Sequence, residues 1–334
     1  MQDAAGSLSV LGAGSYGTAL SIAAASRGRA VMLYCRSPDQ AQRMERERQN
    51  ARYLPGITFP QTLHVTASLE EAAHFSPNLL VVVPSAAFRD MVAAIVPFLH
   101  PGQGLAWATK GLDVASGRLL SEVAEELMGR PARMVSLSGP TFARELALGL
   151  PTAIAAAGTD REFCLSFCEL LHTPTFRIYE NSDMIALQLG GAVKNVIAIA
   201  AGLSDGLGFG ANARTALISR GLAEMVRLGL RLGASERGFM GLSGLGDLIL
   251  TCTDDQSRNR RYGYMLGQGK STAEALAAIG QVVEGHEMVR VVHELGQRHG
   301  IALPITNELY EVIVNHRPGL EAAHSLLSRA RTAE

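Results

Sequence analysis

The chain has 334 residues and a formal net charge of −1, with 47% hydrophobic and 18% charged residues. This length is usual for about two domains, and the composition is that of a globular protein with ample apolar material for a core. The near-zero net charge excludes a general nucleic-acid or membrane-surface binder, because such proteins depend on dense positive charge.

Eight short apolar runs, separated by longer helix-compatible stretches, occur in the first half of the chain. Near-continuous apolar strands that alternate with helices are typical of a parallel sheet covered on both faces. The sequence therefore predicts a doubly wound α/β domain with a mostly parallel sheet over residues 1–180. In chain order the runs are LSVLGAG, AVMLYCR, LHVTAS, LLVVVPS, LAWATKG, MVSLSGP, TAIAAAG and FRIYE.

The first of these runs ends in a glycine-rich loop, VLGAGSYGTAL, with glycines at positions 12, 14 and 17. In a strand–loop–helix context, Gly12 permits a tight turn, Gly14 lets a pyrophosphate approach the backbone, and Gly17 allows close helix–strand packing. The motif indicates a Rossmann-type dinucleotide site. A methyltransferase-type adenosyl site is the main alternative.

The second run ends at Arg36, where an acidic residue would bind the ribose hydroxyls of NAD. A basic residue at this position suits the 2′-phosphate of NADP(H), so we expect NADP(H) as cofactor and leave NAD(H) open. The alternative is a solvated turn arginine without a ligand.

Two further loops follow strands at the edge where doubly wound sheets bind ligands. One contains Lys110, and the other, SLSGPTFARE, contains Gly139 and Thr141. The second loop can present backbone N–H groups to a ligand at a helix start, although a capped helix N-terminus without a ligand explains the same pattern.

From about Asn181 the strand-like runs nearly vanish and helical spacing takes over, which predicts an all-α domain over residues 181–334. Its first helix should follow capping and first-turn residues at positions 181–183 and be buried on all sides. Lys194 lies in the middle of this apolar helix, in GGAVKNVIAIAAG. Only three of the 30 basic residues are lysines, and only a desolvated ammonium can lose its proton near neutral pH.

The segment GLSGLGDLILTCTDDQSRNRRYG combines glycines, an isolated Asp247, Thr251 and a basic cluster that begins at Arg258 and Asn259. Arginine forks match phosphate oxygens, so the cluster is a candidate anion site; a solvated helix face is equally compatible with it.

The remaining features favour a reducing compartment and no metal. Four cysteines form no secretory disulfide pattern, and Cys164, Cys168 and His172, although spaced on one helix face, lack a second ligand segment. The chain shows neither a signal-peptide pattern nor an uninterrupted membrane-length apolar stretch. We therefore expect a cytoplasmic protein without membrane insertion, disulfides or metal.

Taken in order and spacing, GAGSYGTAL, ATKGL, SGPTFARE, GGAVKNVIAIAAG, GLSGLGDLILTC, SRNRR and GQVVEG resemble the bacterial NAD(P)-dependent glycerol-3-phosphate dehydrogenases over essentially the whole chain. Beyond the three glycines, the resemblance implies cofactor contacts from Ser15, Tyr16, Arg36, Tyr53, Lys110, Ala143, Arg258, Val282 and Glu284. It implies substrate contacts from Lys110, Gly139, Thr141, Lys194, Asp247, Ser257, Arg258 and Asn259.

The implied reaction is reversible hydride transfer between NADPH and the C2 carbonyl of dihydroxyacetone phosphate, giving sn-glycerol 3-phosphate for phospholipid synthesis. Lys194 is the expected general acid and base, with Lys110, Asp247 and Thr251 completing the catalytic set. A homodimer is compatible with the sequence. Two alternatives stay open: a cofactor-sensing protein that has lost catalysis, and a related dehydrogenase of the 6-phosphogluconate or ketopantoate type.

Overall fold

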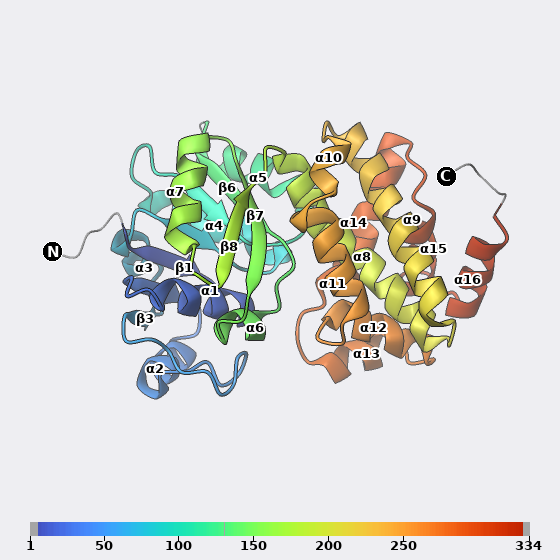
Figure 1. Ribbon diagram of the computed structural model, residues 1–334, viewed down its shortest axis with the longest axis horizontal. Coiled ribbons are helices and arrows are strands. Elements are labelled where there is room, and N and C mark those ends of the chain that lie inside the picture. Colours follow the sequence, from blue (N-terminus) through green and yellow to red (C-terminus); the bar gives the residue numbers. More distant parts are fainter. Residues whose placement is uncertain (1–5, 130, 330–334) are drawn as a thin grey trace. The chain divides into compact units, whose positions relative to one another are not determined.

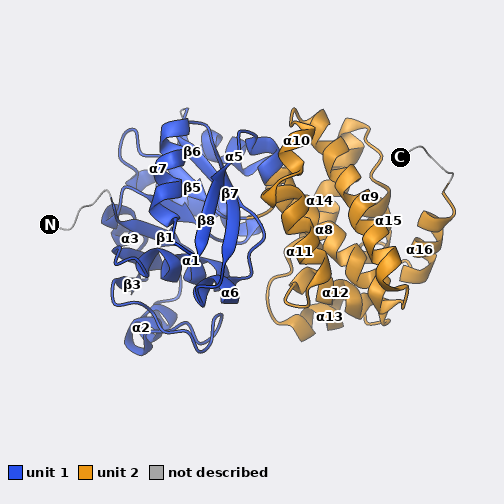
Figure 2. Cartoon of the chain, viewed as in Figure 1, with its two compact units in different colours: residues 1–109, 118–187 blue, residues 110–117, 188–334 orange. Residues whose placement is uncertain are grey.

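The computed structural model describes residues 6–129 and 131–329. The chain forms two compact units (Figure 2), of which the first contains residues 1–109 and 118–187 and the second residues 110–117 and 188–334. The second unit therefore includes a short excursion from the N-terminal half, and each unit is described by itself below.

Unit 1 is built on one eight-stranded sheet with the order β3-β2-β1-β4-β5-β6-β7-β8 (Figure 1). Its strands pair in parallel, except that β7 runs antiparallel to β6. In the register, Val10 of β1 lies between Leu33 of β2 and Leu80 of β4. The predicted mostly parallel sheet is confirmed. The strands are β1 (Leu8–Leu11), β2 (Val31–Tyr34), β3 (Leu63–Thr66), β4 (Leu79–Val81), β5 (Leu105–Trp107), β6 (Met134–Ser138), β7 (Thr152–Gly158) and β8 (Phe176–Glu180).

Helices cover both faces of this sheet because its side chains alternate between two apolar cores. Leu8 and Val10 join a core with residues of α1, α2 and α7, whereas Leu11 joins a second core with residues of α3, α4 and α5. Apolar side chains on both faces give the near-continuous apolar runs of the sequence. The helices are α1 (Ser15–Ala25), α2 (Pro38–Glu47), α3 (Leu69–Phe75), α4 (Phe88–Ile95), α5 (Leu120–Met128), α6 (Ala143–Ala147) and α7 (Arg161–Leu171), with 3₁₀ turns η2 (Ser85–Ala87) and η3 (Val96–Phe98).

The described residues of unit 2 form helices joined by turns and loops, with no strand, which agrees with the predicted helical C-terminal region. A π-helical turn, η4 (Leu242–Gly246), leads directly into α11. The helices are α8 (Met184–Gly206), whose first four residues belong to unit 1, α9 (Gly210–Arg231), α10 (Glu236–Phe239), α11 (Asp247–Thr253), α12 (Arg258–Gly267), α13 (Thr272–Ile279), α14 (Glu284–His299), α15 (Pro304–Ile313) and α16 (Gly319–Leu327).

Helix α8 is the buried centre of unit 2, and glycines let its neighbours approach it closely. A Cβ atom on Gly202 would lie 2.0 Å from the Arg260 carbonyl oxygen of α12, and one on Gly263 would lie 2.0 Å from that of Ile199. The two backbones therefore touch, which side chains at these positions would prevent. The helix begins at Met184 after Asp183, whose carboxylate accepts a hydrogen bond of 2.8 Å from the Ala186 N–H. Asp183 is thus the cap rather than a first-turn residue.

The length and composition of α8 alone would allow it to cross a membrane. However, 89% of its most apolar 18-residue window is buried inside the structure. Core helices of this kind meet the same criterion, so the helix is weak evidence of a membrane span.

Candidate functional site

The glycine-rich loop joins β1 to α1, and its first and third glycines are required by packing. Gly12 has φ +125°, and a Cβ there would lie 2.3 Å from the Val82 carbonyl oxygen. A Cβ on Gly17 would lie 2.0 Å from the Gly12 carbonyl oxygen. Any side chain at either position would displace backbone, so the loop has to pass this close to β4 and to its own helix.

The second glycine, Gly14, leaves open space instead. A Cβ built on it would meet no heavy atom within 4 Å. Gly14 is also the N-cap of α1, with no side chain to bond the N–H groups that follow at Ser15 and Tyr16. An open, uncapped helix N-terminus with its partial positive charge fits a pyrophosphate. The residues present therefore fit the phosphates of a dinucleotide.

Arg36 follows β2 at the carboxyl edge of the sheet and is exposed. Within the described ranges it forms no ion pair with a carboxylate. Tyr53 lies in the loop after α2, half-buried, with the guanidinium carbon of Arg52 5.0 Å from its ring centre. A free arginine at the end of β2 is the feature expected for a 2′-phosphate.

The loop after β6 is held in an unusual backbone conformation at Gly139. This residue has φ +156°, and a Cβ there would lie 2.7 Å from the Ile154 Cα of β7. Thr141 donates from Oγ1 to the Gly139 carbonyl oxygen at 3.3 Å, and α6 begins two residues later at Ala143 without a side-chain cap. Close approach to β7 therefore explains the glycine.

In unit 2, two lysines converge on one buried carboxylate. Lys194 Nζ of α8 donates to Asp247 Oδ1 at 2.5 Å and to Thr251 Oγ1 at 3.0 Å, and Lys110 Nζ donates to Asp247 Oδ2 at 2.8 Å. Thr251 itself donates to the Asp247 carbonyl oxygen at 2.6 Å. Lys194 and Asp247 are 5% and 1% exposed. The structure thus brings together all four residues of the predicted catalytic set, and we call these four residues the lysine cluster.

The environment lowers the pKa of Lys194 to about 8. Burial is the largest cause, because the low-dielectric interior disfavours an ammonium; Asp247 opposes it and Lys110 adds to it. Burial would raise the pKa of Asp247, but the two ammonium groups outweigh it and hold that pKa below its usual range. Lys194 can therefore exchange a proton near neutral pH while Asp247 stays ionised.

Backbone geometry fixes the two halves of the lysine cluster. Asp247 is the first residue of α11, directly after the π-helical turn. A Cβ on Gly190 of α8 would lie 2.4 Å from the Ser243 carbonyl oxygen in that turn. The glycine therefore lets α8 and the turn touch one helical turn before Lys194, which sets the short distance between Lys194 and Asp247.

The predicted anion segment starts at Ser257, the N-cap of α12, whose side chain accepts from the Arg260 N–H. Arg258 is half-buried; burial lowers its pKa, and the charge of Glu284 opposes this effect. Arg258 donates to Gln281 Oε1 at a long 3.4 Å. Val282, which follows Gln281 in the sequence, is 53% exposed.

Arg260, by contrast, has structural partners. It pairs with Asp255 and, at 2.7 Å, with Asp205 of α8, which Arg214 also binds. Arg258 is thus available to a ligand, whereas Arg260 is not. The composition of the segment does not distinguish the two arginines.

Sequence reasoning missed Asn195, which follows Lys194 and is buried. Its Oδ1 accepts from Asn259 Nδ2 at 2.8 Å, and its Nδ2 donates to the Gly191 carbonyl oxygen at 3.1 Å. Asn259 Oδ1 in turn accepts from the Gly285 N–H at 2.9 Å. These amides join α8, α12 and α14 next to Lys194 and Arg258. A polar residue inside an otherwise apolar helix was the available signal.

All four cysteines are buried and free. In the part of the chain that the structure describes, no three His, Cys, Asp or Glu side chains are grouped to hold a metal ion.

A doubly wound sheet with an open glycine loop, together with a helical unit that contains a buried lysine–aspartate cluster, defines a nicotinamide-dependent dehydrogenase of the two-unit kind. Family models agree with this class: the N-terminal model of NAD-dependent glycerol-3-phosphate dehydrogenase matches residues 7–164, and the C-terminal model matches residues 183–324. The chain belongs to the NAD-dependent glycerol-3-phosphate dehydrogenase family.

Individual relatives are similar over nearly the full length. The glycerol-3-phosphate dehydrogenase, NAD(P)+, of Serratia proteamaculans (strain 568) is 55% identical and covers 98% of this chain and 97% of its own. That of Tolumonas auensis is 53% identical over 99% of this chain and 100% of its own. The crystal structure of glycerol-3-phosphate dehydrogenase from Coxiella burnetii superimposes with a TM-score of 0.94 at 43% identity, covering 97% of this chain and 99% of that one.

Proposed function

We propose that the protein interconverts dihydroxyacetone phosphate and sn-glycerol 3-phosphate with NADP(H), and with NAD(H) as the less favoured cofactor. The observation that carries this proposal is the lysine cluster, in which a buried ammonium with a pKa of about 8 lies against an ionised carboxylate and a second ammonium. The likeness to relatives with this activity over nearly the whole chain supports it.

When bound, the reduced nicotinamide supplies the hydride that reaches C2 of the substrate. Negative charge then grows on the carbonyl oxygen, where Lys194 and Lys110 stabilise it, and Lys194 transfers its proton to that oxygen. In the reverse direction the neutral amine of Lys194 takes the proton from the C2 hydroxyl. Asp247 holds both ammonium groups in place, and Thr251 fixes the rotamer of Lys194 by its 3.0 Å hydrogen bond.

The substrate phosphate is assigned to Arg258 at the N-terminus of α12. Among the residues that the structure describes, its half-buried guanidinium donates only one long hydrogen bond, to Gln281, which leaves donors for phosphate oxygens. Ser257 and Asn259 flank it and order the helix start through their own hydrogen bonds. In unit 1, Gly139 and Thr141 are assigned to the substrate as well.

The cofactor is assigned to residues that retain open donors or open space. Gly12, Gly14 and Gly17 shape the loop for the pyrophosphate, with Ser15 and Tyr16 at the start of α1, and Arg36 selects the 2′-phosphate. The remaining proposed cofactor contacts are Tyr53, Lys110, Ala143, Arg258, Val282 and Glu284. We further assign cofactor binding to the domain of residues 1–180 and catalysis to that of residues 181–334.

We also propose that the enzyme is cytoplasmic, does not insert into membranes, forms a homodimer and supplies glycerol 3-phosphate for phospholipid synthesis. The apolar helix α8 is mostly buried, which fits a protein that works in water. A fractionation of cells and a sedimentation measurement test these assignments separately from the reaction.

The reaction is tested by NADPH oxidation with dihydroxyacetone phosphate, compared with ketopantoate and with the keto acid of the 6-phosphogluconate reaction. Turnover should require dihydroxyacetone phosphate. Lys194→Met should lower turnover by at least about 100-fold, the lower range for general acid catalysis, and should keep NADPH binding. NADPH binding without turnover of any substrate would identify a sensor, and preference for another acid would identify a related dehydrogenase.

The phosphate assignment has its own test in Arg258→Ala. This variant should lose about 3 kcal/mol of transition-state stabilisation with dihydroxyacetone phosphate, since a charged hydrogen-bonded pair is removed. With unphosphorylated dihydroxyacetone, on which the wild type should be slow, the substitution should cost little more, because the interaction is already absent. Equal damage to both substrates would show that Arg258 serves the cofactor or the fold.

A further inference from the structure

The end of β2 carries more unpaired positive charge than Arg36 alone. In the loop and helix that follow it, Arg46 and Arg48 pair with Glu47 and Glu45 at 3.3 and 3.1 Å. Across the described residues, however, neither Arg36, Arg43 nor Arg52 forms an ion pair with a carboxylate. An arginine that pairs with no acid keeps its donors available for an anionic ligand.

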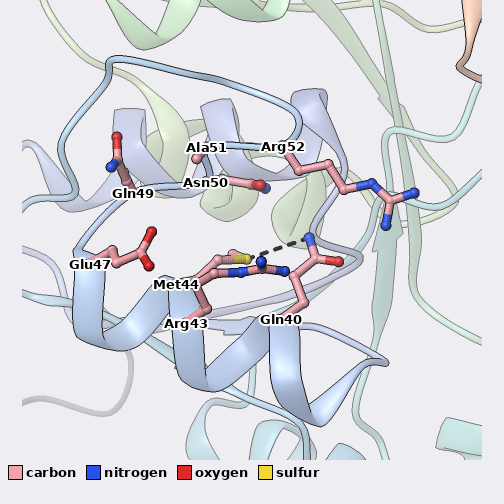
Figure 3. A pocket seen from close by; sticks show the side chains of 8 residues that line it. All are labelled: Gln40, Arg43, Met44, Glu47, Gln49, Asn50, Ala51 and Arg52. Atoms are coloured by element: carbon pink, nitrogen blue, oxygen red, sulfur yellow. Dashed lines mark hydrogen bonds between the residues drawn. The ribbon is translucent and has the colours of Figure 1, made fainter.

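Arg43 and Arg52 line one cavity of about 470 Å³ between α2 and the loop of residues 49–52. Figure 3 shows their side chains directed differently: Arg43 lies along α2 toward Gln40, whereas Arg52 extends away from the other lining side chains. The Arg52 guanidinium is therefore not directed toward the other side chains that line the cavity, Glu47 among them.

The positive charge of Arg52 acts on a residue at the end of β2. Burial raises the pKa of the Cys35 thiol, which directly precedes Arg36, and the positive charges of Arg36 and Arg52 both oppose that rise. Arg43 is not among the groups that act on this thiol. The charges of Arg36 and Arg52 thus both act on Cys35, directly after β2.

The loop that carries Arg52 is fixed to the glycine-rich loop itself. Asn50 is 1% exposed, and its Nδ2 donates to the Ala13 carbonyl oxygen at 3.0 Å and to Thr18 Oγ1 at 2.9 Å. Its Oδ1 accepts from the Tyr53 N–H at 3.3 Å, and its carbonyl oxygen accepts from the Leu54 N–H at 2.8 Å. Hydrogen bonds therefore hold the loop that carries Arg52 against the glycine-rich loop.

The base of the same loop is closed by Arg48. This residue adopts the left-handed conformation, with φ 53°, and donates to the carbonyl oxygens of Pro60 at 2.7 Å and Leu63 at 2.6 Å. At the tip, the guanidinium carbon of Arg52 lies over the Tyr53 ring, 5.0 Å from its centre, in a cation–π contact that favours this position of the side chain. A donor ordered before binding loses less entropy when a ligand arrives.

We propose that Arg52 is a second determinant of cofactor specificity, which binds the 2′-phosphate of NADPH together with Arg36. A phosphate monoester carries nearly two negative charges at neutral pH, and two guanidinium groups match that charge where one does not. The inference depends on the cofactor assignment of the proposed function and extends it to a residue outside the family resemblance.

The test measures binding by isothermal titration calorimetry, independently of turnover. The ligands are adenosine 2′,5′-bisphosphate and 5′-AMP, which differ by the 2′-phosphate, and inorganic phosphate. Arg52→Ala should weaken the bisphosphate by at least about tenfold, as for a charged hydrogen bond, and leave 5′-AMP within about twofold. Arg52→Lys should lose less, because it keeps the charge.

Arg43→Ala is the matched control, since it removes the same charge from the same cavity and should leave all affinities unchanged. The proposal is overturned if Arg52→Ala leaves the bisphosphate affinity intact, if it weakens bisphosphate and 5′-AMP equally, if Arg43→Ala has the same effect, or if inorganic phosphate binds comparably. Thermal melting shows whether each variant folds. If Arg52→Ala does not fold, the affinity of Arg52→Lys for the bisphosphate tests the proposal instead. A wild type that binds the bisphosphate but does not turn over dihydroxyacetone phosphate refutes the proposed reaction only.

Discussion

The Asp247→Asn variant tests the electrostatic balance of the lysine cluster directly. Asparagine keeps the shape of the side chain and removes the negative charge that lies 2.5 Å from Lys194 Nζ and 2.8 Å from Lys110 Nζ. With both lysines protonated, the net charge of the lysine cluster would change from +1 to +2. Lys194 is the more buried of the two lysines and should release its proton first.

The size of the effect follows from the environment of Lys194. Burial already lowers the pKa of Lys194 to about 8 while the carboxylate opposes it. Breaking a buried charged pair costs about 3–5 kcal/mol, and one unit of pKa corresponds to about 1.4 kcal/mol. Neutralising Asp247 should therefore lower the pKa of Lys194 by at least about two further units, which leaves its amine mostly neutral at pH 7.

The sign of the pH dependence differs between the two directions of the reaction. Reduction needs the ammonium, so kcat/KM for dihydroxyacetone phosphate should be constant below pH 8 and fall above it. Oxidation needs the neutral amine, so its kcat/KM should rise up to that pH and then level off. In Asp247→Asn both midpoints should move at least about two units toward acid, and reduction at pH 7 should suffer more than oxidation.

Initial rates of NADPH oxidation and of NADP+ reduction, measured across pH with saturating cofactor, give both midpoints. Asp247→Glu is the control, because it keeps the charge and should leave the midpoints near those of the wild type even if its rates fall. Unchanged midpoints in Asp247→Asn would refute the reasoning, since the carboxylate would then have no influence on the proton that is transferred.

Three further predictions concern other parts of the chain. Arg36→Asp should reverse the preference from NADPH to NADH, because the carboxylate repels the 2′-phosphate and accepts from ribose hydroxyls; equal use of both cofactors by wild type and variant would contradict the assignment. Gly202→Ala should lower the free energy of unfolding by about 1–3 kcal/mol in urea titrations, because its Cβ would lie 2.0 Å from the Arg260 carbonyl oxygen. Gly14→Ala is the control, because a Cβ at Gly14 has open space and this variant should unfold like the wild type. Glu224→Ala should cost about 1–3 kcal/mol, because its buried carboxylate accepts from the Ile305 N–H at 2.5 Å at the start of α15. Glu311→Ala, at a half-buried position of the same helix with an exposed hydrogen bond from Asn315, should cost less, and equal losses would show that burial of Glu224 is unimportant.

The central strands of unit 1, such as β1, β4, β5 and β6, could be predicted because they are buried on both faces, which makes each a continuous apolar run between helices. The edge strands β3 and β8 are partly exposed. The direction of β7 could not be predicted. TAIAAAG reads the same for either orientation, and only the connection decides: the short helix α6, Ala143–Ala147, returns the chain to pair β7 antiparallel with β6. Direction is thus set by the geometry of a loop rather than by the apolar pattern.

The residues of the lysine cluster could be named from the sequence, but their contacts could not. Lys110 and Asp247 lie 137 positions apart, and nothing in ATKGL shows that residues 110–117 pack with the helical unit rather than with the sheet they follow. The partners of Arg260 were equally hidden, because Asp205 approaches it only where glycines let α8 and α12 touch. Side-chain identity is local information, whereas ion pairing depends on the tertiary packing.

The burial of α8 explains why a lysine, and not an arginine, stands at position 194. An arginine in the middle of this helix would keep its charge at any pH near neutral, since a guanidinium does not give up its proton, and burial would only cost stability. At Lys194 the same burial lowers the pKa to about 8, where the proton can be transferred. Without Asp247 the fall would continue until the amine carried no proton to give. The buried carboxylate therefore limits how far desolvation can act, and the two effects together make Lys194 both an acid and a base at the pH of the cell.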